Sequence, residues 1–142
     1  MAISTVHTAL GELRRSDGGF DFSGRLGEVA IVLDVDDAET AVAVAQRVST
    51  TIGDLDDFAR RVATQLAYVF APEGPDEVEV WENGESIVSG AEFARRLTLG
   101  CVTAASDGDV EVYFDDDEMF GGHTIRAWID ESGTVTDAQI AG

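Results

Sequence analysis

Apolar residues recur every three or four positions between Leu55 and Phe70, and this periodicity restricts the fold more than any other feature of the chain. The stripe consists of Leu55, Phe58, Ala59, Val62, Ala63, Leu66 and Phe70, with Arg60, Arg61 and Gln65 off it. Steps of three and four place side chains on one face of an α-helix. The pattern therefore predicts an amphipathic helix over residues 54–70, with its apolar face packed against a sheet.

Local signals predict two more helices. The run Asp36-Asp37-Ala38-Glu39 carries the acids typical of a helix start, and Gly53 interrupts the apolar pattern that follows it. A helix is therefore expected between these two points. The run Ser89-Gly90-Ala91-Glu92 is a capping-box pattern and predicts a third, short helix with Phe93 and Leu97 facing inward.

Strand-like runs occupy both ends of the chain. They cover residues 11–15, 18–26, 27–35, 77–81, 98–104, 109–114, 123–130 and 134–141. Turn residues at 106–108 and 131–133 predict two hairpins among the last four runs. Because strands precede and follow a helical middle, we expect one α+β domain over residues 1–142, with a largely antiparallel sheet and about three helices packed on one face.

The charge of the chain limits its partners. There are 28 acidic residues against nine arginines and no lysine, which gives a net charge of −19. Nucleic acids and anionic membranes require clustered basic residues, so the charge argues against both as partners. Two explanations remain: the acidity adapts the surface to solubility or salt, or it attracts a basic protein partner.

Other features of the sequence bear on the compartment. The single cysteine, Cys101, cannot form a disulfide within the chain, which fits a reducing compartment. No apolar run is long enough to predict a transmembrane helix, and the first residues lack the basic and apolar regions of a signal peptide. We therefore expect a cytoplasmic protein that is a monomer or a small homo-oligomer.

Several short motifs resemble those of a bacterial protein family. They are Phe22-Ser23-Gly24, Ser89 to Phe93, Gly108 to Phe114, Met119-Phe120-Gly121-Gly122-His123-Thr124-Ile125, and Asp137 to Gly142. The chain resembles small bacterial proteins of unknown function, domain family 2262 or a sibling of it. Such families often lie beside polymorphic-toxin genes and are treated as immunity proteins. The resemblance implies that role, and it assigns no catalytic residue.

The acidic run before Met119 raises the question of a metal site. Its candidate ligands are Asp115, Asp116, Asp117, Glu118 and His123. Four consecutive acids point in different directions, whereas calcium loops space their ligands at alternate positions. Zinc would need three or four ligands, and only His7, His123 and Cys101 stand outside the acids. We therefore expect no metal and a solvated acidic turn between two strands.

His123 has two possible roles. By the two-residue period of a strand it shares a face with Ile125, Ala127 and Ile129, so a core histidine bonded to a backbone carbonyl or an acid is the favoured interpretation. Gly121 and Gly122 then form a tight bend that Phe120 anchors and His123 holds. A small enzyme or metal binder centred on His123 remains the alternative.

Catalytic motifs are missing from the sequence. Cys101 lies in a predicted strand, no serine stands in a Gly-x-Ser-x-Gly elbow, and no phosphate-binding loop is present. Abundant acids make any particular pair of carboxylates uninformative for glycoside chemistry. We expect neither an enzyme nor a cofactor.

The favoured hypothesis is a non-catalytic binding protein, an immunity protein that neutralises a basic toxin or another basic protein through its acidic surface. The expected contacts are acids in loops and at strand ends, with Trp81 and Tyr113 as aromatic anchors. These acids are Asp107, Asp109, Asp115, Asp116, Asp117, Glu118, Glu73, Asp76, Glu77 and Glu79. Burial of Trp81 under the third helix is an equal alternative. The competing hypothesis is an accessory domain whose acidity serves only solubility or salt adaptation.

Overall fold

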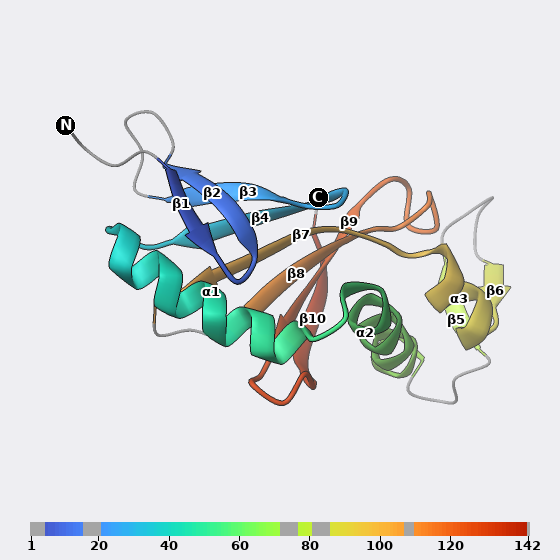
Figure 1. Cartoon of the computed structure of the whole chain (residues 1–142). Coiled ribbons are helices and arrows are strands. Elements are labelled where there is room, and N and C mark those ends of the chain that lie inside the picture. The colour runs from blue at the N-terminus through green and yellow to red at the C-terminus, as the bar shows by residue number, and fades with distance from the viewer. Residues whose placement is uncertain (1–4, 16–20, 72–76, 81–85, 107–109, 142) are drawn as a thin grey trace.

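The computed structural model describes residues 5–15, 21–71, 77–80, 86–106 and 110–141 (Figure 1). The helices are α1 (Ala38–Ile52), α2 (Leu55–Val69) and α3 (Gly90–Arg96). The strands are β1 (Thr5–Thr8), β2 (Gly11–Arg15), β3 (Phe22–Leu26), β4 (Val29–Asp34), β5 (Val78–Val80), β6 (Ser86–Val88), β7 (Thr98–Ala105), β8 (Val110–Asp115), β9 (Thr124–Ile129) and β10 (Val135–Ala141).

Eight of the strands form one sheet in the order β1-β2-β3-β4-β7-β8-β9-β10, and β5 and β6 form a separate two-stranded sheet. Neighbours in the large sheet pair antiparallel, with one exception: β4 and β7 pair parallel at its centre. Parallel neighbours need a long crossover connection. Here that connection holds all three helices and the small sheet, and the predicted α+β class with a largely antiparallel sheet is confirmed.

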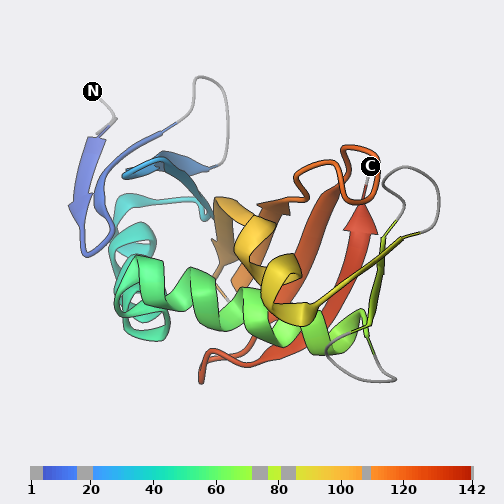
Figure 2. The same cartoon turned by 90° about the vertical axis from the view of Figure 1, so that its right-hand side faces the viewer.

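The three helices lie on the same side of the large sheet (Figure 2). Strand residues that point towards them are buried, as Ile31, Val102, Val112 and Ile125 show with no exposed surface. Residues that alternate with these on β4, β7, β8 and β9 are only half-buried or exposed, because no described helix covers their face. The sheet thus has a core face and a second face, here called the uncovered face.

Capping side chains lie at the three helix starts that the sequence predicted. Asp37, Asp54 and Ser89 each accept a hydrogen bond from a backbone N–H in the first turn, which satisfies a donor that the helix itself leaves unpaired. Helix α1 ends at Gly53, whose φ of 63° is a left-handed value that glycine adopts without strain.

Helix α2 packs its predicted stripe into the core. Phe58, Val62 and Leu66 have no exposed surface. Phe70 follows the last helical residue, is half-buried, and its ring lies 6.0 Å from Phe93 and 5.9 Å from Phe120. These three rings join α2, α3 and the turn after β8, so this turn is part of the core.

Two short strands were not predicted. They are β1, which pairs with β2, and β6, which pairs with β5. Strand β5 lies within the predicted run 77–81, whereas Trp81 lies outside the described residues. No helix among the described residues is long and apolar enough to cross a membrane.

Gly24 stands where β3 crosses close to β2. A Cβ atom at this position would lie 2.6 Å from the backbone oxygen of Glu12 and 2.8 Å from Cδ2 of Leu13. Real Cβ atoms do not approach a backbone oxygen so closely, so only glycine fits without moving a strand. This gives a packing reason for the Phe22-Ser23-Gly24 motif.

Candidate functional site

The acidic turn after β8 is built around one buried carboxylate. Asp116 is only 1% exposed. Its Oδ1 accepts the backbone N–H of Glu118 at 3.0 Å, and its Oδ2 accepts those of Phe120 at 2.8 Å and His123 at 3.0 Å. The expectation that Asp116 is a solvated acid is therefore wrong, because three donors of its own turn hold this carboxylate inside the fold.

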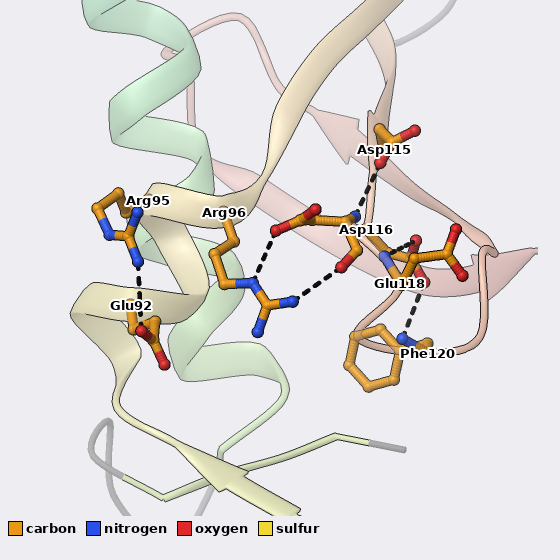
Figure 3. Close-up of polar contacts among 8 residues, drawn as sticks. Glu92, Arg95, Arg96, Asp115, Asp116, Glu118 and Phe120 are labelled. Atoms are coloured by element: carbon orange, nitrogen blue, oxygen red, sulfur yellow. Dashed lines mark hydrogen bonds and ion pairs between the residues drawn. The ribbon is translucent and has the colours of Figure 1, made fainter. Parts of the chain in front are cut away.

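The flanking acids also have structural partners (Figure 3). Asp115 Oδ1 accepts the backbone N–H of Asp117 at 2.8 Å. Arg96 from α3 donates to Asp117 Oδ2 and to the Asp117 backbone oxygen, both at 2.8 Å. Asp117 and Glu118 have positive φ angles of 49° and 65°, which are uncommon for residues other than glycine. The helix α3 and the buried carboxylate together hold this backbone conformation.

The two glycines and the histidine complete the turn. Gly121 and Gly122 have φ angles of 80° and 82°, and a Cβ on Gly122 would lie 3.4 Å from the Glu118 carboxylate oxygens. His123 precedes β9 and is half-buried, and its Nδ1 lies 2.6 Å from the backbone oxygen of Phe120. The predicted bond to a backbone carbonyl and the buried anchor Phe120 are confirmed, and the carboxylate of Asp116 adds three hydrogen bonds to backbone N–H groups of the turn.

The remaining predicted contact residues divide into three groups. Glu77, Glu79, Asp115, Asp117 and Glu118 are exposed, and Tyr113 is half-buried on the uncovered face. Asp107, Asp109, Glu73, Asp76 and Trp81 lie outside the described residues. Among the described residues, no three His, Cys, Asp or Glu side chains are grouped in a way that could hold a metal ion.

A second cluster, which the sequence interpretation missed, lies on the uncovered face. Strand pairing sets two rows of opposed residues across β7, β8, β9 and β10. One row contains Thr103, Glu111, Trp128 and Asp137, and the other contains Cys101, Tyr113, Arg126 and Gln139. Polar and aromatic side chains from four consecutive strands therefore meet on this face.

Glu111 is the centre of the cluster. Its Oε1 accepts hydrogen bonds from Arg126 Nη2 at 2.7 Å and from Trp128 Nε1 at 2.9 Å. Its Oε2 accepts weaker ones from Thr103 Oγ1 at 3.3 Å and from the Tyr113 hydroxyl at 3.2 Å. Four donors on three strands thus converge on one carboxylate and fix the positions of both aromatic rings.

The guanidinium of Arg126 lies between those rings. Its central carbon is 4.5 Å from the centroid of the Trp128 ring and 5.8 Å from that of Tyr113. A cation over an aromatic face is attracted by the electron density of the ring. The uncovered face therefore holds one guanidinium by an ion pair and aromatic stacking together.

The same contacts shift the pKa of two groups. Burial acts most strongly on Glu111 and would raise its pKa, but the hydrogen bond and charge of Arg126, with the hydrogen bonds of Trp128 and Tyr113, lower it below the ordinary value. Burial and the negative charge of Glu111 raise the pKa of Tyr113. At neutral pH the cluster thus contains an ionised Glu111 and a protonated Tyr113.

Beside the cluster the uncovered face is hollowed into a pocket of about 410 Å³. It opens between the ends of β4 and β7 and is bordered by Glu111 and Trp128. Its other walls include Val32, Asp34, Thr103 and Ala105. Only the spacing of Glu111 with Tyr113, and of Arg126 with Trp128, could have indicated this site from the sequence, because both pairs alternate with apolar core residues.

Residues 7–140 match the model of a family described as an uncharacterized protein conserved in bacteria, DUF2262. No curated protein and no solved structure matches the chain. The matched region runs from β1 to β10 and includes both the acidic turn and the uncovered face. The resemblance to domain family 2262 is thereby confirmed, and the chain belongs to the bacterial DUF2262 family.

Proposed function

We propose that the protein is a non-catalytic binding protein that recognises a basic protein partner, and that it acts as an immunity protein against a toxin with a basic active face. The observation that carries the proposal is the way the arginines are used. Six of the nine arginines are engaged within the fold, so the acidic excess of the chain remains at the surface.

Four arginines pair with carboxylates, in the pairs Arg61–Asp57, Arg95–Glu92, Arg96–Asp117 and Arg126–Glu111. Two more donate to backbone carbonyl oxygens: Arg15 to Asp36, and Arg47 to Ala105 and Ser106. Exposed acids without an ion pair among the described residues include Glu28, Asp34, Asp56, Glu77, Glu79, Glu118, Glu131 and Asp137. The outward field is therefore negative, as a basic partner would require.

The uncovered face supplies a place for such a partner. It combines Tyr113 and Asp115, two of the predicted contact residues, with Trp128 and Glu111. Aromatic side chains that are already held in position lose little conformational freedom on binding, which favours them as interface anchors. A toxin that acts on nucleic acid needs a basic surface for phosphate, and an acidic partner would be steered to that surface and cover it.

The test begins with affinity capture from the native bacterium, followed by measurement of binding between the purified captured protein and this chain. We expect a basic partner whose association slows steeply as salt rises, because salt shortens the reach of the field to about 8 Å at physiological ionic strength. When the partner is a toxin, co-expression of this chain should protect cells.

Two variants of equal charge locate the interface. The first replaces Asp34, Asp115 and Asp137 with Asn on the uncovered face. The control replaces Glu39 and Glu131 with Gln and Asp56 with Asn, all exposed and away from that face. The first should slow association more than the control. Salt-independent binding, or no binding at low salt together with no protection, would rule out the proposal and favour acidity that serves solubility alone.

A further inference from the structure

The pocket on the uncovered face has walls of two kinds. Val32 and Ala105 provide apolar surface, and Trp128 adds an aromatic wall. Asp34 and Glu111 provide carboxylates, and none of the described lining residues is basic. A ligand that matches these walls has an apolar stem and a positively charged end.

The two carboxylates are not equivalent. Glu111 already accepts four hydrogen bonds and is paired with Arg126, so its charge is largely compensated. Asp34, at the end of β4, pairs with Ala105 through its backbone, and its exposed side chain makes no hydrogen bond or ion pair with any described residue. An incoming cation would therefore pair with Asp34, while Glu111 holds the indole of Trp128 in place through its Nε1.

The fold itself shows which cation this chemistry suits. Arg126 lies over Trp128 and pairs with Glu111, so an indole and a carboxylate on this face already hold a guanidinium. A planar guanidinium stacks on aromatic rings and is less strongly hydrated than an ammonium, which lowers the cost of moving it into a pocket. The pocket beside Trp128 repeats the combination, with Asp34 in the role that Glu111 plays for Arg126.

We infer that this pocket receives the side chain of an arginine from the basic partner, with its stem along Val32 and Ala105, its guanidinium at Asp34, and Trp128 as a wall. The inference rests on the proposed function and names the anchor residue by which that partner is recognised. Because the partner would cover the surface around the pocket, an arginine seated there would be shielded from solvent by the surrounding contacts.

The test uses three short peptides with blocked ends and one central residue: arginine, citrulline or lysine. Citrulline has the shape of arginine without its charge. The signal is the NMR resonance of the Trp128 indole N–H, assigned with the Trp81→Phe variant. We expect a saturable shift with the arginine peptide, a smaller one with lysine and none with citrulline. Equal responses to arginine and citrulline, or tighter binding of lysine, would contradict the inference.

Two substitutions then test whether the arginine peptide binds in the pocket. Asp34→Asn should weaken the arginine peptide about threefold, the size expected for one exposed charge pair. Asp36→Asn removes the same charge two residues away, at a position that does not line the pocket, and should leave the affinity unchanged. An equal effect of the two variants would place the peptide elsewhere.

The two proposals fail in different ways. If the arginine peptide causes no shift of the Trp128 resonance, and a basic partner binds Asp34→Asn as tightly as the native chain, the arginine pocket is rejected and the proposed function stands. If the pocket binds the arginine peptide but the protein has no basic partner, the proposed function is rejected and the arginine pocket stands.

Discussion

The carboxylate of Asp116 accepts a hydrogen bond from the backbone N–H of Phe120 at 2.8 Å, inside the turn that connects β8 to β9. The bond joins an acid to the residue whose ring packs between α2 and α3. It explains how a run of four acids is compatible with a folded core: the buried one accepts three backbone N–H groups of the turn, and the other three are exposed.

Asp116→Asn should destabilise the fold by about 2–3 kcal/mol, because an amide NH₂ group cannot accept the hydrogen bonds that Oδ2 accepts, and buried donors are left unpaired. Asp115→Asn makes the same chemical change at an exposed neighbour that keeps its acceptor oxygen, and should cost less than about 0.5 kcal/mol. Urea unfolding measures both. Equal stability of the two variants would show that the turn does not depend on Asp116.

The stability that Glu111 contributes should depend on pH. Its pKa in the fold is below the ordinary value of 4.5, so its contribution is complete above that pH and is lost as the pH falls through the lower, folded pKa. The difference in unfolding free energy between the native chain and Glu111→Gln should therefore be constant near neutral pH and shrink in acid. Glu131→Gln, at an exposed turn, is the control. A difference that grows in acid would contradict the assigned direction.

Truncations of side chains on α2 should distinguish its buried face from its exposed face by their effect on stability. Phe58→Ala and Leu66→Ala remove fully buried side chains, and each should cost about 2–5 kcal/mol through lost burial and a residual cavity. Tyr68, on the same helix, is 60% exposed, and Tyr68→Ala should change stability by no more than about 0.5 kcal/mol. The three melting curves check the orientation of the helix. Near-native melting of both core variants would place α2 elsewhere.

Cys101 should react slowly with alkylating reagents. Burial raises the pKa of its thiol above the ordinary value of 9.0, so the reactive thiolate is scarce near neutral pH. We expect alkylation of the folded chain to be slower than that of the chain in urea, and to accelerate as the pH rises above about 9. Mass spectrometry follows the rate. If the folded and unfolded chains are alkylated at the same rate at pH 8, the thiol is not protected by burial and its pKa is not raised.

The helices were predictable because their signals are local. Asp37, Asp54 and Ser89 cap first turns within three residues of themselves, and apolar steps of three and four orient α2 without reference to the rest of the chain. The hairpin of β9 and β10 was predictable for the same reason, since its turn lies between adjacent strands. The parallel contact of β4 with β7 was not, because all three helices separate these strands in the sequence.

The candidate sites were less accessible to sequence reasoning. The sequence does not distinguish between four adjacent acids. In a regular strand alternate side chains face inward, but the positive φ angles at Asp117 and Glu118 interrupt this alternation, so the sequence could not show that Asp116 is the buried one. The cluster at Glu111 depends on the register of β8 against β9, which the eight residues between these strands do not reveal.

The sequence by itself determined the class of fold, the places where the helices begin, and the acidic character of the chain, because periodicity, capping and charge are properties of neighbouring residues. Only the tertiary structure decided that Asp116 stabilises a turn by accepting its backbone hydrogen bonds, and that Glu111 accepts hydrogen bonds from Arg126, Trp128 and Tyr113 on one face. The role of a carboxylate is set by the donors that surround it, and in both cases folding brings those donors together.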